Sequence, residues 1–297
     1  MTEISINNLQ KYFHNKPILN IPIFHANQGE IISIIGSNGA GKSTFIKLLA
    51  GILLQDKGNI NIYGTSNASK KIHLLVKFVP ESGQGLYSYL TAMENLQYFL
   101  GLNGISLIHV REDLEELFDY FSFTPYKDTL VSELSQGNRQ KLSLILSLVQ
   151  KPKVLCLDEP TNGLDILTKK KLIVLLKNYA SLQKTIIFIT SHDTSFIEQV
   201  STRVILIEEG HIIQDSTFQE IFRNIKEREV YKLLLSKDDK LLLESLFPSL
   251  DYNMQEEGLW VETKDQEIYR ILFERTKVIQ FFREPVSLED LLYEVLR

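Results

Sequence analysis

The stretch Glu30-Ile-Ile-Ser-Ile-Ile-Gly-Ser-Asn-Gly-Ala-Gly-Lys-Ser43 decides how this chain folds. Its first part is a short β-branched run of the kind that forms a strand, and apolar side chains recur at helical spacing from Lys42 to Ala50. Glycines at positions 36, 39 and 41 separate the two segments. We therefore expect a strand, a glycine-rich loop and a helix in direct succession.

The glycine-rich loop fits the pattern G-x-x-x-x-G-K-[ST] in the strand-loop-helix context that this pattern requires. Its glycines let the backbone curl so that N–H groups point at phosphate oxygens, and the helix N-terminus adds positive potential. Lys42 would reach the β- and γ-phosphates of a nucleotide, and the Ser43 hydroxyl would ligate Mg²⁺. The predicted phosphate-binding residues are Gly36, Ser37, Asn38, Gly39, Ala40, Gly41, Lys42, Ser43 and Thr44.

Two acidic residues follow a second apolar run, Val154-Leu-Cys-Leu-Asp158-Glu159. This run and Thr185–Thr190 have the continuous apolar character of parallel strands buried on both faces, and helix-like stretches at 139–150 and 168–182 precede them. Ligands of such sheets bind at the carboxyl ends of the strands, so Asp158 would hold Mg²⁺ and Glu159 would deprotonate an attacking water. Taken alone, the acidic pair also fits a helix N-terminal cap, but the phosphate loop favours the catalytic interpretation.

The composition excludes several other classes of protein. With 297 residues, 44% hydrophobic and 23% charged, the chain has the composition of a folded protein of one large or two modest domains. Its 32 basic and 37 acidic residues give a net charge of −5, so no global basic field attracts nucleic acid or anionic lipid. The single cysteine, Cys156, excludes an intrachain disulfide framework and indicates a cytosolic protein.

Targeting and metal signals are missing from the sequence. Residues 1–24 lack the pattern of a secretory signal, and no apolar run approaches the roughly 18 to 20 residues that cross a bilayer. No Cys/His cluster has the spacing of a zinc site. Any action at a membrane is therefore expected to pass through a partner.

Changes of pattern along the chain predict two domains. We expect an α/β domain over residues 1–222, with a helical insertion at about 86–150 that contains helices at Ala92–Leu102 and Arg111–Phe121. Residues 203–213 alternate in polarity and turn at Gly210 as a hairpin does. Beyond the charged stretch 223–229, the order β-α-β-β-α-β predicts a small α+β domain of the ferredoxin-like type over 223–297. A last helix is expected at Ser287–Leu296.

Further motifs resemble the nucleotide-binding subunits of ABC transporters, a branch of the P-loop NTPases, over about residues 1–220. Leu134-Ser-Gln-Gly-Asn138 resembles the signature motif, which this family carries just before the strand that ends in the acidic pair. Asp165 resembles the D-loop aspartate, His192 the switch histidine, and Phe13, with Tyr12 as the alternative, the aromatic residue that stacks on adenine. The resemblance implies contacts to ATP from Phe13, Ser135, Gly137 and Asp165, and catalytic roles for Lys42, Glu159 and His192.

Three positions depart from the pattern of that family. Glu81 stands where the family usually has a glutamine that senses Mg²⁺ and the γ-phosphate; a carboxylate there could ligate the metal but cannot donate a hydrogen bond when ionised. The signature reads Leu-Ser-Gln-Gly-Asn instead of Leu-Ser-Gly-Gly-Gln, and Ile166 replaces a common proline. We therefore expect these departures to adjust the rate of hydrolysis and to leave the phosphate contacts in place.

The resemblance implies a clamp made from two ATPase subunits, identical or siblings. In relatives, the signature of one subunit closes over ATP held by the other, and hydrolysis releases the pair. The ending Ser287-Leu-Glu-Asp-Leu-Leu-Tyr-Glu294 resembles the tail of ATPases from exporters of drugs, peptides, lantibiotics and polysaccharides. This resemblance implies a separate integral membrane subunit, which would hold the ATPase at the cytoplasmic face of the cell membrane.

Two other functions fit the sequence less well. A soluble ABC-type switch ATPase on ribosomes or nucleic acid usually carries two cassettes or a long coiled coil, and this chain has neither. A P-loop kinase or GTPase leaves the signature and His192 unexplained. In relatives the membrane subunit docks near Leu86–Leu90, whose aromatic residues could equally pack the core of the insertion.

Overall fold

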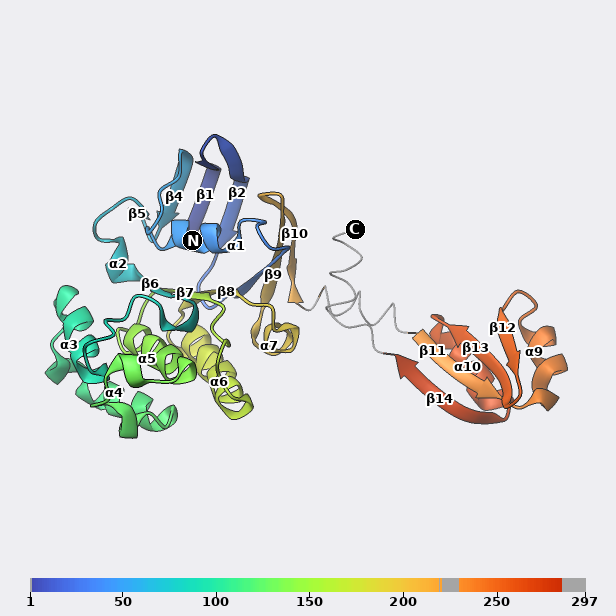
Figure 1. Ribbon diagram of the computed structural model, residues 1–297. Helices are drawn as coiled ribbons and strands as arrows, with labels where there is room; N and C mark the ends of the chain where they lie inside the picture. The colour runs from blue at the N-terminus through green and yellow to red at the C-terminus, as the bar shows by residue number, and fades with distance from the viewer. Residues whose placement is uncertain (1, 219, 221–229, 285–297) are drawn as a thin grey trace. The chain divides into compact units, whose positions relative to one another are not determined.

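The computed structural model describes residues 2–218, 220 and 230–284. The chain divides into two compact units, Met1–Phe218 and Gln219–Arg297 (Figure 1). The helices and strands of the first unit are β1 (Ile4–Phe13), β2 (Lys16–Ala26), β3 (Ile31–Ile35), α1 (Lys42–Leu49), β4 (Lys57–Ile62), β5 (Thr65–Ser66), α2 (Ile72–Leu75), β6 (Val76–Val79), α3 (Ala92–Leu102), α4 (Arg111–Tyr120), α5 (Gln136–Leu148), β7 (Val154–Asp158), α6 (Ile166–Leu182), β8 (Ile186–Thr190), α7 (Thr194–Val200), β9 (Arg203–Glu208) and β10 (His211–Thr217). Those of the second are β11 (Val230–Leu235), α9 (Lys240–Leu246), β12 (Tyr252–Gln255), β13 (Gly258–Thr263), α10 (Gln266–Arg275) and β14 (Val278–Glu284).

A six-stranded sheet forms the centre of the first unit, in the order β10-β9-β3-β8-β7-β6. The five strands from β9 to β6 run parallel to one another, and β10 pairs antiparallel with β9 at the edge. Every residue of β3, β7 and β8 is buried, which explains why these strands are continuous apolar runs. The predicted strands and the hairpin at Gly210 are confirmed.

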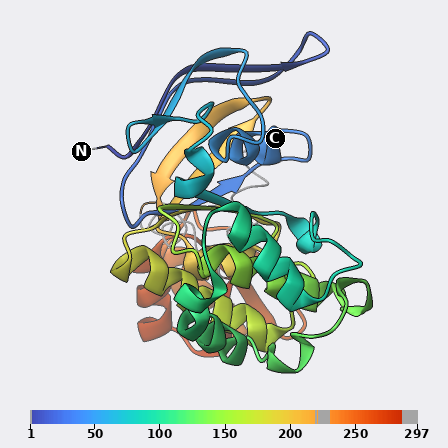
Figure 2. The same cartoon turned by 90° about the vertical axis from the view of Figure 1, so that its left-hand side faces the viewer.

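Side chains that alternate along the central strands belong to two separate cores. Leu155 and Leu157 of β7 join the core that α3, α4, α5 and α6 cover. Val154 and Cys156 of the same strand face the opposite core, which α1 and the strands β1, β2 and β4 complete. Figures 1 and 2 show these layers on either side of the central sheet.

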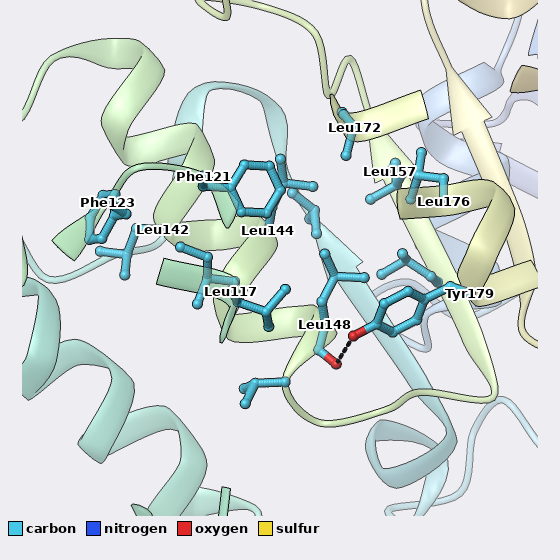
Figure 3. Close-up of a cluster of buried hydrophobic side chains, with 14 of the residues drawn as sticks. Leu117, Phe121, Phe123, Leu142, Leu144, Leu148, Leu157, Leu172, Leu176 and Tyr179 are labelled. Carbon is cyan, nitrogen blue, oxygen red and sulfur yellow. Dashed lines mark hydrogen bonds between the residues drawn. The ribbon is translucent and has the colours of Figure 1, made fainter. Parts of the chain in front are cut away.

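The core under the helices is drawn in Figure 3. Leucine side chains of α5 and α6 interleave there with aromatic residues, and the Tyr179 hydroxyl donates a hydrogen bond of 3.2 Å to the Leu148 carbonyl oxygen (Figure 3). This packing fixes α5 and α6 relative to each other. The loops at the N-terminal ends of these two helices therefore keep a defined position.

A four-stranded antiparallel sheet, in the order β2-β1-β4-β5, was missed in the sequence analysis. Its signal is alternation: Ile4 and Ile6 are buried, while Ser5 and Asn7, which follow them in turn, are not. The register with β4 shifts near Asn8, whose φ is 50°. The alternating stretch is therefore short, and a bulge interrupts the period of two.

The predicted helical insertion is present as α3 and α4. Thr91 begins α3 with a capping box, because its side chain accepts from the Glu94 N–H while the Glu94 carboxylate accepts from the Thr91 N–H. Helix α5 begins at Gln136, three residues before the expected stretch, because the Ser135 side chain accepts from the Asn138 N–H and caps it.

The second unit contains one sheet in the order β12-β13-β11-β14, with every pair antiparallel. Helix α9 connects β11 to β12, and α10 connects β13 to β14. Leu243 of α9 and Leu272 of α10 pack in one small core with Leu233 of β11 and Val261 of β13. The predicted helix Ser287–Leu296 lies outside the described residues.

Within the described ranges, no helix has the length and apolar character that a bilayer crossing needs. The same residues contain no group of three or more His, Cys, Asp or Glu side chains placed to hold a metal ion. Cys156 is fully buried in β7, where it packs as a core residue, and burial raises the pKa of its thiol.

Candidate nucleotide-binding site

The glycine-rich loop leaves β3 and enters α1 as predicted. Gly41 adopts φ 108° at the start of the helix, and a Cβ there would stand 2.6 Å from Leu19 Cδ2 of β2. Glycine is therefore required at this position both by conformation and by space. The Gly210 N–H donates to the Ala40 carbonyl oxygen (3.2 Å), and the Gly210 carbonyl accepts from the Asn20 N–H (2.8 Å). The β9–β10 turn thus supports the loop from outside.

The Lys42 side chain turns back into the loop. Its Nζ donates to the carbonyl oxygens of Gly36 (2.8 Å) and Ser37 (3.0 Å). Burial lowers the pKa of the Lys42 ammonium, and the carboxylates of Glu159 and Asp158 oppose that shift. Lys42 is therefore a buried cation held within the phosphate loop.

Asp158 lies at the end of β7, where the parallel strands end together. Its Oδ1 accepts hydrogen bonds from Ser43 Oγ (3.0 Å) and from Thr190 Oγ1 (2.6 Å), and only 8% of the residue is exposed. Thr190 is the residue that pairs with Asp158 in the register of β7 and β8. The structure thus joins the two predicted metal-binding residues Ser43 and Asp158 and adds Thr190 as their anchor.

Glu159 follows directly in a left-handed conformation, with φ 47°. Its N–H donates to the Thr190 carbonyl oxygen (3.0 Å), and its carboxylate Oε2 accepts from the His192 N–H (3.2 Å). His192 Nε2 lies 3.5 Å from Glu159 Oε1. The acidic pair therefore does not cap a helix, and Glu159 and His192 face each other across the ends of β7 and β8.

Burial raises the pKa of the Glu159 carboxyl. His192 opposes the rise, whereas the neighbouring carboxylates of Asp158 and Glu81 add to it. A carboxylate with a raised pKa is a stronger base than an exposed one, and a pKa closer to the working pH suits general-base catalysis. The electrostatics of this position therefore fit proton abstraction from water.

Glu81 follows β6 and reaches toward the same edge of the sheet. Its Oε1 accepts a hydrogen bond of 2.8 Å from Asn162 Nδ2. Its carboxyl group also adds to the rise in the pKa of Glu159. The third predicted metal-binding residue thus lies in the same region as Asp158, although no hydrogen bond joins it to Ser43 among the described residues.

The signature and D-loop residues lie at helix N-termini. Ser135 caps α5, and Asp165 caps α6 by accepting from the N–H (2.9 Å) and hydroxyl (2.7 Å) of Thr168. These hydrogen bonds lower the pKa of the Asp165 carboxyl. Gly137 packs so closely that a Cβ there would overlap the Gly163 carbonyl oxygen. Within the described part of the chain, neither Ser135 nor Gly137 is hydrogen-bonded to the phosphate loop of the same chain.

Phe13 lies at the end of β1, and 41% of it is exposed. The Lys11 Nζ stands 5.4 Å from the centre of its ring. The neighbouring Tyr12 is less exposed and is engaged through its hydroxyl, which donates to Gln10 Oε1 (3.0 Å). Phe13 is therefore the ring of the two that is more accessible for stacking.

The chain is similar to a known family over most of its length. A family model described as ABC transporter matches residues 19–162. The bacitracin transport ATP-binding protein of Bacillus licheniformis is 31% identical over 265 residues, which cover 87% of this chain and 84% of that protein. This chain belongs to the ABC transporter ATP-binding proteins. It is an ATP-binding subunit of an ABC transporter and an ATPase.

Two further comparisons agree with this assignment. The Nod factor export ATP-binding protein I of Burkholderia thailandensis is 29% identical over 290 residues, which cover 97% of this chain and 94% of that protein. A solved ATP-binding subunit of an ABC transporter is 25% identical, with a TM-score of 0.70 over 75% of this chain and 93% of that one. The first unit of this ATPase therefore has the ABC-type P-loop fold.

A groove opens on the helical side of the ABC-type unit. Leu86 lines it with Phe78 of β6, Phe99 of α3 and Leu146 of α5. Beside it, the Tyr87 ring stacks on Phe99 with centroids 5.7 Å apart, while Tyr89 is 71% exposed. Tyr87 therefore packs within the insertion, and Tyr89 faces solvent.

Three residues near the site were missed in the sequence analysis. Thr190 and Asn162 are the hydrogen-bond partners of Asp158 and Glu81, and Gln140 Oε1 accepts from the Gly83 N–H (2.9 Å). Thr190 could have been found, because a polar residue ends the strand beside the acidic one. Asn162 and Gln140 could not, because only the folded loops of this ABC ATPase bring them to their partners.

Proposed function

We propose that this ATPase binds ATP together with Mg²⁺, pairs head to tail with a second ATPase subunit, and powers export through a separate integral membrane subunit. The observation that carries the proposal is the division of the site within one chain. The phosphate loop, Asp158 and Glu159 form one half around the ends of β3, β7 and β8. Ser135 caps α5 and Gly137 lies in its first turn, and neither is hydrogen-bonded to that half among the residues that the structure describes.

The side chains around Asp158 fit a hard divalent cation. The Ser43 hydroxyl and the Asp158 carboxylate are oxygen donors 3.0 Å apart, and Glu81 supplies a further carboxylate in the same region. Ser43, Asp158 and Glu81 would hold the ion, which would neutralise charge on the β- and γ-phosphates. Thr190 keeps Asp158 oriented through its 2.6 Å hydrogen bond.

Hydrolysis would rest on Lys42, Glu159 and His192. Glu159 would accept a proton from the attacking water, and its burial and raised pKa support this role. Lys42 would exchange its two carbonyl partners in the loop for phosphate oxygens. His192 is 63% exposed at its side chain, so it is accessible to a γ-phosphate while its N–H holds Glu159.

The second subunit would supply the residues that the phosphate half lacks. Ser135 and Gly137 of that subunit would close over the phosphates, and Asp165 would lie between the two sites. Phe13 would stack on adenine, and its exposed ring beside Lys11 supports this assignment. ATP would then act as a ligand at the interface, and its hydrolysis would release the pair.

Export is supported by relatives that match beyond the ABC-type unit. The matches to the bacitracin transport and Nod factor export proteins are longer than the first unit, so both include part of the second. We further propose that the second unit is ferredoxin-like, because its βαββαβ order and its sheet β12-β13-β11-β14 match that arrangement. Its role would be structural support or dimerisation.

The groove lined by Leu86 and Phe99 is the proposed contact for the membrane subunit. Its walls are mostly apolar, and it lies between the insertion and α5, so a short amphipathic helix could fill it. A Leu86→Asp variant should lose the membrane partner but keep ATP hydrolysis. A matched change on an exposed leucine of the same insertion, Leu102→Asp, should keep both.

The decisive experiment is affinity purification from detergent-solubilised membranes, followed by identification of the proteins that copurify. Recovery of an integral membrane protein with several spans, lost in Leu86→Asp, is the expected result. Recovery of ribosomes or nucleic acid without such a protein would instead favour a soluble ABC-type switch ATPase. Reconstitution of the complex in vesicles would then separate export from import by the direction of ATP-driven movement.

A further inference from the structure

Hydrogen bonds join the Glu81 loop to the helix that carries the signature. Gln136 Nε2 donates to Ser82 Oγ (2.7 Å), and Gln140 Oε1 accepts from the Gly83 N–H (2.9 Å). Gln140 is fully buried, and Gly83 packs so closely on the backbone of Arg139 that a Cβ would stand 2.7 Å from its carbonyl oxygen. The loop Glu81–Gly83 is thus fastened to the first turn of α5.

The D-loop closes the same network from the other side. Asn162 Nδ2 donates to Glu81 Oε1 (2.8 Å), a bond that the charge of the carboxylate strengthens. Gly163 lies directly against Gly137, and a Cβ on Gly163 would stand 3.0 Å from Gln136 Cγ. The Glu81 loop, the signature and the D-loop are therefore in contact within one chain, and we call these three segments the relay cluster: residues 81–83, 135–140 and 161–165.

Two departures from the family pattern meet in this cluster. A glycine at position 136 could not donate to Ser82, and the Gln136 side chain supplies that bond. The Glu81 carboxyl oxygen Oε1 accepts from Asn162 Nδ2. The side chains of Gln136 and Glu81 therefore join the same three segments, and neither makes a hydrogen bond to the phosphate loop in the described part of the chain.

We propose that Gln136 and Asn162 are positioning residues that couple the nucleotide site of one chain to the half-site that this chain offers its partner. The inference rests on the proposed two-subunit site. Gln136 holds Ser82 to the signature, and Asn162 holds Glu81 to the D-loop. A change at Glu81 when nucleotide binds is thereby transmitted to Ser135 and Gly137, which sit on the same tightly packed cluster.

This coupling predicts a specific separation of effects. Without the Gln136–Ser82 bond, the loop and the signature move independently, so ATP binding to one chain still occurs but prepares the partner half-site less well. In a Glu159→Gln background, Gln136→Ala should leave the ATP affinity of the monomer within about twofold. It should weaken ATP-dependent dimerisation about tenfold, because the closed pair loses the stabilisation of one well-placed hydrogen bond. Asn162→Ala should act in the same direction.

A double-mutant cycle tests whether Gln136 acts through Ser82. Ser82→Ala should reproduce the loss of dimerisation, and Gln136→Ala combined with Ser82→Ala should be no worse than either single variant. Gln199→Ala removes a glutamine that donates to the Ser195 carbonyl oxygen on α7, and it serves as the matched control without effect. Additive losses, or a neutral Ser82→Ala, would overturn the proposal, because Gln136 would then act directly on the nucleotide or the partner.

A second measurement does not depend on dimerisation. Hydrogen exchange of the monomer should show faster exchange at residues 81–85 in Gln136→Ala and in Asn162→Ala, with an unfolding temperature close to that of the parent. Unchanged exchange would overturn the proposal even if dimerisation weakened. If the Glu159→Gln parent itself fails to dimerise with ATP, the proposed function fails, while the exchange data still decide whether the relay cluster orders the loop.

Discussion

Asp158 and Glu159 lie at the end of the buried strand β7, with Lys42 of the phosphate loop facing them, whereas Ser135 and Asp165 cap the N-termini of α5 and α6. In the first region, charged groups are removed from water, and burial shifts the pKa values of Lys42 and Glu159. In the second, the corresponding side chains satisfy backbone N–H groups as caps. The first region therefore holds ionisable groups with perturbed pKa values, and the second holds its backbone conformation through local hydrogen bonds.

This difference indicates what each region can do alone. Groups with perturbed pKa values are suited to acid–base and electrostatic catalysis, because folding has already removed them from water. Helix caps and close glycine contacts, such as Gly137 against Gly163, fix the shape of a surface to which a second molecule can bind. Substitutions at the strand ends should therefore affect turnover most, and those in the relay cluster should affect coupling.

The largest effect is expected for Glu159→Gln, which removes the base but keeps the shape. Turnover should fall by about 10² to 10⁴, the usual contribution of a positioned acid or base. ATP binding should persist, and the ATP-bound pair should accumulate, as seen by light scattering. Glu112→Gln, on the exposed first turn of α4, is the control. Near-normal hydrolysis by Glu159→Gln would show that the base lies elsewhere.

Thr190→Val should have the next largest effect. It deletes the 2.6 Å hydrogen bond to Asp158 while keeping the volume of the side chain, and we expect about a tenfold loss of kcat and a weaker response to Mg²⁺. Thr185→Val is the matched control, because Thr185 precedes the same strand and donates a buried 3.0 Å bond to the Pro152 carbonyl oxygen. Both should lower the unfolding temperature similarly. Equal kcat in the two variants would contradict an orienting role for Thr190.

The contrast between the two regions also decided what the sequence could reveal. Buried strands need continuous apolar runs, so β3, β7 and β8 were predicted together with the residues at their ends. The antiparallel sheet of β1, β2 and β4 escaped, because a bulge at Asn8 breaks its alternation. The partners Asn162 and Gln140 depend on how loops from β6, α5 and α6 meet, and no local pattern encodes such contacts.

The pH dependence of turnover should report the burial of Glu159. The base must be ionised, so activity is lost as the pH falls through its raised pKa, and the acidic limb of kcat/KM should lie above the value of an ordinary glutamate, about 4.3. Because His192 opposes the rise, His192→Ala should move this limb to higher pH. The unfolding temperature should be followed over the same range. An acidic limb that stays at the ordinary value while the fold is intact would disprove the assignment.

The smallest effect is expected for Glu81→Gln, which separates the charge of this side chain from its hydrogen bond. A glutamine oxygen can still accept from Asn162, so the contact with the D-loop survives, while a ligand charge for the metal is lost. The hydrolysis rate or its Mg²⁺ dependence should change severalfold, with ATP binding retained, whereas Glu81→Ala should in addition loosen the D-loop and weaken dimerisation. Titration of Mg²⁺ at saturating ATP measures the first effect, and light scattering measures the second. If Glu81→Gln and Glu81→Ala behave alike in both assays, the hydrogen bond to Asn162 contributes nothing to coupling. If Glu81→Gln changes neither the hydrolysis rate nor its Mg²⁺ dependence, Glu81 does not take part in metal binding.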